Sequence, residues 1–499
     1  MKKIFMNEWM KERPYPKADA SDAYYVDIAN KVAAILQETV TDQLITDVAR
    51  RSMGCCLSRW FEDIISETGI WMTATARMQE LYGLRVPFMA AAEEYYEGEV
   101  NRADIRFLLW YYLQILCRSV KVLNPDDGHI QQAADRIYEL LSGEYETAPA
   151  NDTLTTFVYG RLFGEDDFEH YTMALRWFHM QCYLNPLNMA DYLNLLDQKV
   201  RQLPPDAPAG LVRYQEDELF YDHVCFGRSG FLTHTSAEWL ALLGARDPRL
   251  SAWAEAHIAR SLFYRYRKED ERYLYLEDLL TGEEVPVLRR SFTKDCQEAV
   301  AAGEKILRLR LLYFGGEWQQ IGFEQMGDPE KVMGDVEQFR ELVLHPTAKA
   351  NYERFMQASG GRPFVFVKTQ QELKDFIGER MGIVFDDSDQ RLQVDEQTGA
   401  VLMASPEVGL HIQLALAECL KSADNTFYDA SSAKKNAMSF MVNPEVIPYS
   451  LSCALYDAGM LDDALMNSRK GEQYGARLLH DNARFMTDFF YGRCRGIEG

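Results

Sequence analysis

Residues 306–323 read ILRLRLLYFGGEWQQIGF, and this stretch decides how the chain divides into structural classes. In its first half, leucines alternate with Arg308 and Arg310, which is the period-two spacing of a β-strand with two unlike faces. Two arginines cannot be buried unpaired without a large penalty, so we expect the leucine face inside. The glycine pair at 315–316 is typical of a tight turn, and Trp318 beyond it is expected at the small core.

The same spacing extends upstream of this stretch. Short apolar runs at Tyr273–Leu276 and Glu284–Leu288 flank the turn residues 278–282. Runs of this length joined by glycine turns predict a meander of short strands. We therefore expect residues 271–326 to form a small β-barrel-like domain.

The sequence before this region has helical spacing. Apolar residues repeat at helical intervals in 22–37 and in 60–78, and residues 102–120 are apolar on nearly every side, as in a buried central helix. Three prolines in 203–210 indicate a surface loop. The prediction is an α+β fold, mostly α-helical. The expected domains are a helical domain (1–150), a second helical region (151–270), the β domain (271–326) and a mixed α+β domain (327–499).

The C-terminal region shows both kinds of pattern. Residues 364–367 are predicted to be a strand that leads into a helix at 370–380. Residues 391–394 and 400–403 flank a turn and are interpreted as a hairpin, and a helix is expected around 410–420.

Composition limits the possible classes of protein. The chain has 499 residues, with 76 acidic against 53 basic side chains and a net charge of −23. This excess repels phosphate backbones, so nucleic acid is an improbable partner. No apolar run approaches the length of about 20 residues needed to span a bilayer, and the nine cysteines are scattered without a C-x-x-C pair. We expect a cytoplasmic protein with no membrane partner; its oligomeric state stays open.

Few sequence motifs indicate an active site or a ligand-binding site. There is no phosphate-binding glycine loop, so no cofactor is expected, and no spacing of His, Cys or carboxylates fits a metal site. The sequence Gly-Arg-Ser-Gly around Ser229 has His223, Cys225 and His234 nearby, which makes a Ser/His or Cys/His site conceivable. A polar loop is the simpler interpretation.

One basic and aromatic segment stands out in this acidic chain. Arg265, Arg267 and Lys268 alternate with tyrosines and precede the strand that carries Arg308 and Arg310. Such residues can stack on bases and hold phosphates, so they are a candidate anion or nucleic-acid patch. The alternative is a helix end with ordinary solvated cations, in which the two sets of arginines lie apart. We expect that alternative.

Several N-terminal segments together resemble a bacterial domain-of-unknown-function family of the gut-anaerobe type. The segments are KKIFMNEWM (2–10) with RPY (13–15), YYVDIANKV (24–32), RWFEDIISETGIW (59–71), LYGLRVPF (81–88) and VNRADIRFLLWYYLQ (100–114). They cover roughly the first 120 residues. The resemblance implies a bacterial cytoplasmic protein and carries over no catalytic residue, ligand or cofactor.

Two functions remain as hypotheses. The first is a non-enzymatic interaction or scaffold protein with one or more protein partners, favoured by the missing cofactor motifs and the large apolar fraction. The second is a hydrolase-like or nucleic-acid-processing enzyme with a site assembled from residues distant in sequence, which one sequence does not reveal. Whether the protein is an enzyme stays open here.

Overall fold

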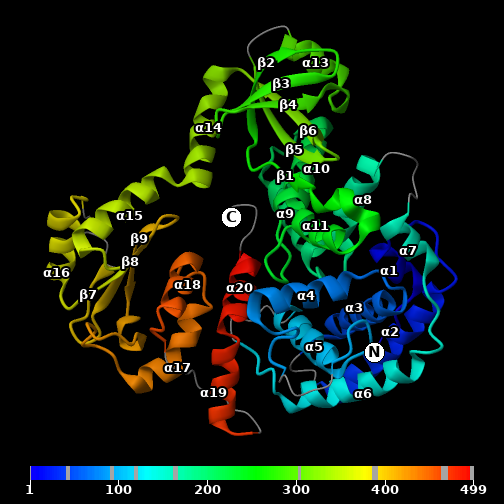
Figure 1. Ribbon diagram of the computed structural model, residues 1–499, viewed down its shortest axis with the longest axis horizontal. Coiled ribbons are helices and arrows are strands. Elements are labelled where there is room, and N and C mark those ends of the chain that lie inside the picture. Colours follow the sequence, from blue (N-terminus) through cyan, green and yellow to red (C-terminus); the bar gives the residue numbers. More distant parts are fainter. Residues whose placement is uncertain are drawn as a thin grey trace. The chain divides into compact units, whose positions relative to one another are not determined.

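A computed structural model describes residues 2–40, 45–89, 95–116, 122–160, 167–301, 305–384, 392–461 and 470–494. The chain forms two compact units. The first comprises Met1–Arg118, Gly128–Val336 and Arg495–Gly499, and the second comprises Ser119–Asp127 and Glu337–Cys494. The fold is α+β and mostly α-helical (Figure 1). Within the described residues, no helix is both long enough and apolar enough to cross a membrane.

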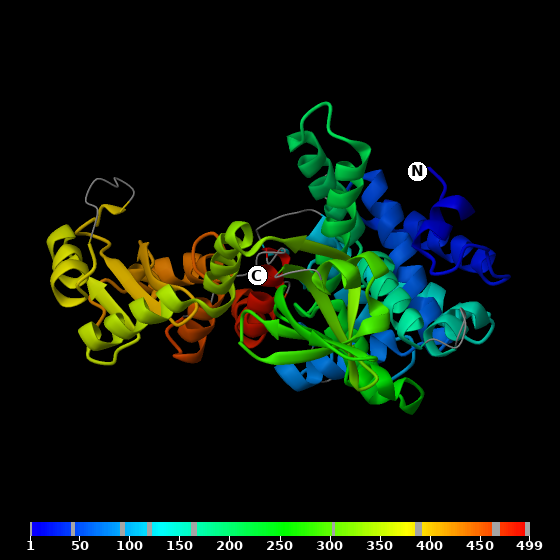
Figure 2. The same ribbon diagram turned by 90° about the horizontal axis from the view of Figure 1, so that it is seen from above.

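The first unit begins with a set of helices. They are α1 (Met6–Trp9), α2 (Asp22–Thr39), α3 (Asp47–Ile65), α4 (Ile70–Tyr82), α5 (Arg102–Leu116), α6 (Gly128–Glu144), α7 (Asp152–Tyr159), α8 (Asp167–Gln181), α9 (Asn188–Gln202), α10 (Ala209–Phe226), α11 (Ser236–Arg246) and α12 (Ser251–Ala254). Figure 2 shows α9 and α10 side by side as a hairpin, joined by the proline-rich loop.

Helix α5 is the central buried helix that its composition predicts. Most of its side chains are buried, and Trp110 is fully inaccessible to solvent. The Trp110 ring lies 4.6 Å from Phe88 and 6.1 Å from Phe107, centroid to centroid. The prediction of a buried helix is therefore confirmed over residues 102–116, and residues 117–120 lie outside the described part.

The helical pattern of residues 60–78 is interrupted in the structure. Helix α3 ends at Ile65 and α4 starts at Ile70, and Glu67 and Gly69 between them have φ angles of 50° and 76°. These left-handed conformations break the run of helical backbone, and glycine adopts them without strain. The spacing of apolar residues alone does not predict such a break.

The sheet of the first unit is closed. Its strands are β1 (His257–Ile258), β2 (Phe263–Glu269), β3 (Tyr273–Asp278), β4 (Glu284–Leu288), β5 (Ile306–Phe314) and β6 (Glu317–Gly327), with α13 (Lys294–Ala301) before β5. The order is β1-β5-β2-β3-β4-β6, and β6 pairs again with β5 to close the ring. Leu307, Leu309 and Leu311 are fully buried inside it, and Trp318 packs against that core, as the alternation predicts.

Strand β2 corrects the prediction that residues 151–270 are helical throughout. The basic segment that we interpreted as a helix end is a strand, paired with β3 on one side and β5 on the other. Tyr264 and Tyr266 of this strand pack on the barrel core, whereas Arg265 between them and Arg267 after them pair with Glu277 on the outer side. The alternation of tyrosine and cation was itself a period-two signal.

The second unit contains a three-stranded sheet with helices around it. The strands are β7 (Phe364–Val367), β8 (Ala400–Ser405) and β9 (Gly409–Leu414), and the helices are α15 (Pro346–Ser359), α16 (Gln370–Lys374), α17 (Ala430–Met441), α18 (Tyr449–Asp457), α19 (Glu472–Asp481) and α20 (Ala483–Cys494). Helix α14 (Pro329–Leu344) contains the boundary between the units. Strand β8 is central and antiparallel to both neighbours.

Two predictions for this unit are wrong. The hairpin joins β8 to β9 and does not span 391–403, because residues 392–394 form no strand; residue 391 lies outside the described part. Residues 410–414 belong to β9 and are not helical. The turn at 406–408, followed by Gly409 at φ 75°, allows the strands to pair locally, and Leu410, Ile412 and Leu414 pack on the sheet core.

Candidate functional site

A cleft of about 500 Å³ opens in the first unit where segments distant in sequence meet. It lies at the junction of α3 with α4 and also involves the ends of α6, α7 and α11. The lining residues are Asp63, Ile64, Glu67, Gly69, Met72, Thr73, Glu97, Gly98, Glu99, Tyr145, Tyr159, Leu243, Arg246, Asp247 and Arg249. This volume lies in the range of small-ligand and side-chain pockets.

Asp63 builds the wall at the start of α4. Its carboxylate accepts hydrogen bonds from the backbone N–H groups of Ile70 (3.2 Å) and Trp71 (2.7 Å), from the Tyr183 hydroxyl (2.6 Å) and from the Thr68 hydroxyl. The carboxylate thus caps the helix N-terminus. Burial raises the pKa of Asp63, against the effect of these donors. With its oxygens engaged in this way, Asp63 is a structural member of the cleft.

The turn before α4 depends on a glycine. A Cβ atom on Gly69 would lie 3.3 Å from the Tyr159 hydroxyl. The residue that carried it would also have to adopt a left-handed backbone conformation, with φ at 76°. The absence of a side chain lets α7 approach the turn closely. The hydroxyl of Tyr159 donates a hydrogen bond of 2.8 Å to the carbonyl of Thr68, which fixes the two segments together.

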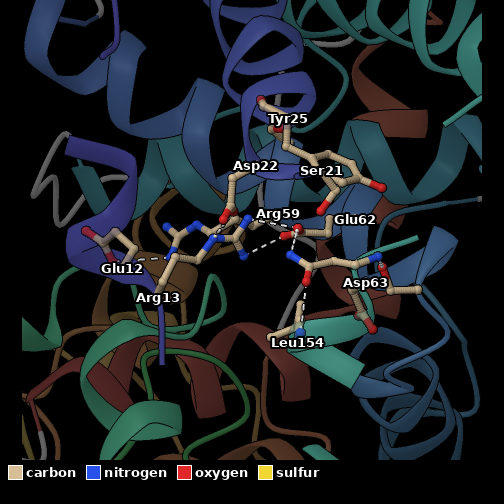
Figure 3. A network of polar contacts seen from close by, with 12 residues as sticks. Glu12, Arg13, Ser21, Asp22, Tyr25, Arg59, Glu62, Asp63 and Leu154 are labelled. Atoms are coloured by element: carbon tan, nitrogen blue, oxygen red, sulfur yellow. Dashed lines mark hydrogen bonds and ion pairs between the residues drawn. The ribbon is translucent and has the colours of Figure 1, made fainter. Parts of the chain in front are cut away.

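A buried polar network fixes the helices beneath the cleft (Figure 3). The Arg13 guanidinium lies 2.6 Å from a Glu62 carboxylate oxygen and 3.0 Å from Asp22, with all three side chains almost inaccessible to solvent. Asn151 donates to Glu62 (2.8 Å) and accepts from the Leu154 N–H (2.8 Å), so that it caps α7. The network joins α2, α3 and α7, and so holds α3, which carries Asp63, to α7, which carries Tyr159.

Two of the acidic groups in the cleft hold arginines of the chain itself. Glu97 accepts from Arg85 (2.9 Å) and from Arg246 (3.2 Å). Partial burial opposes ionisation of Glu97, but these two hydrogen bonds outweigh it, and the pKa falls below its usual value. This first carboxylate is therefore already neutralised by cations.

The second group lies beside Tyr159. Arg249 forms a forked ion pair with Asp247, with a shortest distance of 2.7 Å, and its guanidinium carbon lies 3.8 Å from the centroid of the Tyr159 ring. The hydrogen bonds from Arg249 lower the pKa of Asp247. A guanidinium between a carboxylate and an aromatic face combines ion pairing with cation–π attraction.

The third acidic group borders the second, because the charge of Glu67 acts on both Arg249 and Tyr159. Among the described residues, the side chains of Glu67 and Glu99 make neither an ion pair nor a hydrogen bond, and both are exposed. Tyr145 lies with them: burial, and then the charges of Glu99, Glu146 and Glu67, raise its pKa. This group, which we call the Tyr145 site, consists of Glu67, Glu99 and the Tyr145 ring.

The residues of the predicted basic patch lie elsewhere, on the outer face of the barrel. Arg265 (3.5 Å) and Arg267 (2.5 Å) pair with Glu277, and Lys268 pairs with Glu284 (2.9 Å). All three side chains are therefore engaged with carboxylates, Glu277 of the neighbouring strand β3 and Glu284 of the next strand β4.

Arg308 and Arg310 both pair with helix α10, but Arg308 stays 29% exposed whereas Arg310 is buried. Arg308 pairs with Glu218, and the Nε of Arg310 donates to Asp222 at 2.7 Å. Arg310 is only 3% exposed, so our expectation of a solvated side chain is wrong for it. The two sets of arginines are also not far apart, because β2 and β5 are neighbours with Phe263 opposite Arg308. Burial of Arg310 is possible because Asp222 compensates its charge.

The residues around Ser229 form a structural loop. The Ser229 hydroxyl is fully buried, accepts from the Trp239 indole N–H (2.9 Å) and donates to the carbonyl of Phe231. Cys225 is buried, and His234 accepts from the Nε of Arg77 at 3.2 Å. Ser229, Cys225 and His234 thus do not converge on one reactive centre.

His223 has a partner that sequence reasoning missed. Its Nδ1 lies 2.5 Å from the Nε2 of His179, and the Nδ1 of His179 lies 3.0 Å from the Ser236 hydroxyl. Burial lowers the pKa of His223 to about 4, and burial followed by the effect of His223 lowers the pKa of His179. Ser236 and His179 are fully buried, so this chain links α8, α10 and α11 inside the unit. Across the described residues, no group of three or more His, Cys, Asp or Glu side chains is arranged to hold a metal.

Comparison with protein families gives a match over most of the chain. The family described as "Protein of unknown function (DUF3843)" matches residues 3–306 and 326–491. No curated protein and no solved structure matches the chain. The resemblance that we located over roughly the first 120 residues therefore extends over nearly the whole length, and includes all residues that line the cleft. The chain belongs to the DUF3843 family.

Proposed function

We propose that the protein is a non-enzymatic interaction protein whose cleft receives part of a protein partner. The observation that carries this proposal is the lining of the cleft: carboxylates, arginines and tyrosines, with no His, Cys, Lys or Ser among the lining residues. These side chains suit recognition by ion pairs and aromatic contacts. A Ser/His or Cys/His pair of the kind that activates a nucleophile is absent from this lining.

Hydrolysis is the second candidate, and the chain of Ser236, His179 and His223 is the observation in its favour. A serine hydrogen-bonded to a histidine that is oriented by a second group is the arrangement of an activated nucleophile. The fully buried Ser236 hydroxyl argues against it, since a substrate has no access. A fluorophosphonate probe separates the two: we expect no labelling, whereas labelling that Ser236→Ala abolishes would favour the hydrolase.

Photo-crosslinking tests the proposed function. Benzoylphenylalanine placed at Met72, which lines the cleft, is expected to form adducts with a protein partner in cells. The matched control is Leu81, an exposed residue of the same helix α4 that does not line the cleft. Adducts from position 72 but not from 81 support the proposal. Equal adducts from both positions, or none from 72, would contradict it.

A further inference from the structure

A buried carboxyl group lies next to the loop that forms one wall of the cleft. Asp104 stands in the first turn of α5 and is fully inaccessible to solvent. Its Oδ2 accepts hydrogen bonds from the Asn101 amide (3.3 Å) and from the Tyr95 hydroxyl (3.5 Å), and the indole of Trp71 on α4 is the third polar group beside it. An ionised carboxylate in such a place loses its hydration without gaining a countercharge.

Asn101 connects this carboxyl to the loop 95–100. The side-chain carbonyl of Asn101 accepts from the Tyr96 N–H (2.9 Å), and its amide donates to the carbonyls of Tyr96 (2.8 Å) and Glu99 (3.0 Å). Residues 97–99 of this loop line the cleft. One asparagine side chain therefore holds both the cleft wall and the buried carboxyl.

A second series of contacts leads from the cleft to the same carboxyl. Glu97 accepts from Arg85 (2.9 Å), and the Arg85 guanidinium carbon lies 5.6 Å from the centroid of the Tyr95 ring. The hydroxyl of Tyr95 then contacts Asp104. Because Tyr95 belongs to the loop, a displacement of the loop takes this hydroxyl away from Asp104 and gives water access to the carboxyl.

We infer that Asp104 is a proton switch for this wall of the cleft: the neutral carboxyl keeps the loop 95–100 closed, and loss of its proton favours an open loop in which the carboxylate is hydrated. The importance of this switch for a partner rests on the proposed function, since the loop lines the cleft that receives it. The switch itself depends only on the contacts of Asp104.

The surroundings of Asp104 set the direction of the switch. Burial raises the pKa of Asp104 to about 7 in the closed form, against about 3.9 for a hydrated aspartate. No charged group of the described elements packed against Asp104 acts on it, and its titratable neighbour Tyr95 stays neutral because burial raises the pKa of that phenol too. Glu97 stays ionised, since hydrogen bonds from arginines lower its pKa.

Proton linkage converts this difference into a pH dependence. The closed form holds the proton more tightly, so that opening releases a proton between about pH 4 and 7, and the opening constant rises about tenfold per pH unit over this range. Above about pH 7 both forms are ionised and the constant becomes level. The loop therefore closes as the pH falls below 7.

Hydrogen exchange of the full chain at several pH values measures this opening. The exchange rate of peptides that cover residues 95–101 is divided, at each pH, by the rate of the unstructured sequence, which gives the opening constant. For wild type we expect a rise of about 50-fold from pH 5 to 7 and of about twofold from pH 7 to 8. Asp104→Asn has no proton to lose at this position, so its opening constant should be level.

Two further variants identify the group that titrates. Glu99→Gln removes an exposed carboxyl of the same loop and should keep the rise of the wild type. Tyr95→Phe removes a hydroxyl that favours the ionised form of Asp104, so the rise should continue beyond pH 7. A level opening constant in wild type, or the rise of the wild type in Asp104→Asn, would overturn the inference.

The switch and the proposed function fail separately. If loop opening follows pH as expected but no protein is crosslinked from position 72, the switch stands and the interaction role is wrong. If crosslinks form from position 72 but the opening constant of the wild type is level, the interaction role stands and the switch is wrong.

Discussion

Replacing Arg13 by methionine removes the cation of the buried network beneath the cleft. Arg13 pairs with Glu62 and Asp22, and all three side chains are at most 2% exposed. The variant leaves two carboxylates buried without their countercharge. Breaking a buried pair in this way costs about 3–5 kcal/mol. We therefore expect local opening of α2, α3 and α7 to become about 10²–10⁴ times more frequent.

The loss should depend on pH, and its sign follows from Glu62. Burial raises the pKa of Glu62 in the folded protein, and Arg13 is the largest opposing influence. A carboxyl with a raised folded pKa stabilises the folded protein while it is protonated. This stabilisation is complete below its unfolded pKa of about 4.3 and is lost as the pH rises through the folded pKa. Without Arg13 the folded pKa rises further. The effect of Arg13→Met is therefore largest at neutral pH and shrinks towards pH 4.

Hydrogen exchange followed by mass spectrometry measures these openings segment by segment. Lys31→Met is the control, because Lys31 joins α2 to Glu144 of α6 at 3.0 Å but is 42% exposed. An exposed pair is worth less than about 1 kcal/mol, so exchange should change less than about fivefold. The reasoning is refuted if Arg13→Met changes exchange in α3 and α7 no more than Lys31→Met does.

Four further outcomes follow from the packing and the charges. Trp110→Ala should destabilise the first unit by about 3–5 kcal/mol, seen as faster hydrogen exchange in α5; an unchanged α5 would place Trp110 outside the core. Arg310→Ala leaves Asp222 buried and should cost about 3–5 kcal/mol in chemical unfolding, against less than about 1 kcal/mol for Arg267→Ala; equal effects would contradict the ion pairing. Burial raises the pKa of Asp104 to about 7, so its contribution to stability is full below about pH 4 and lost as pH rises through 7. Asp104→Asn should therefore lose less stability than wild type between pH 4 and 8, by on the order of a few kcal/mol. The same change of melting temperature with pH in both proteins would disprove this. Gly227→Ala places a Cβ 2.7 Å from the His179 ring and should lower the free energy of unfolding by about 1–3 kcal/mol, seen as a lower melting temperature. In the control Gly210→Ala, the new Cβ in α10 meets nothing within 4 Å, so this change should be neutral or stabilising.

The barrel and the central helix were predictable because their signals are local. The side-chain period of a strand is two, so the alternation at 307–311 assigned each residue to a face without knowledge of its neighbours. The continuous apolar surface of 102–116 likewise indicated burial on all sides. Both signals depend only on residues within one element.

The errors occurred where charge or turn geometry obscured the period. In β2 the outward cations suggested a helix end, although Tyr264 and Tyr266 alternated with them. In β9 the apolar residues at 410, 412 and 414 also alternated, but the turn at 406–408 was not recognised as the centre of the hairpin. The pairing partner decides both cases, and it is a property of the tertiary structure.

The cleft itself could not be found in the sequence. Its lining residues are spread from Asp63 to Arg249, and several lie in turns or at helix ends. Gly69 was the one local signal, since a glycine within a helical pattern favours a break. The pairing of Arg308 and Arg310 with α10 was equally invisible, because the partners Glu218 and Asp222 lie about 90 residues earlier in the chain.

Native affinity purification of the full chain, with mass spectrometry of both proteins and small molecules, tests the interaction role most directly. Wild type is compared with Glu67→Gln/Glu99→Gln, which changes the two carboxylates of the Tyr145 site, and with the control Glu271→Gln/Glu283→Gln, which changes two exposed carboxylates of the barrel. The account predicts a protein retained by wild type and by the control but lost from Glu67→Gln/Glu99→Gln. A stoichiometric small molecule in place of a protein, or a set of retained proteins that is the same for all three chains, would contradict it.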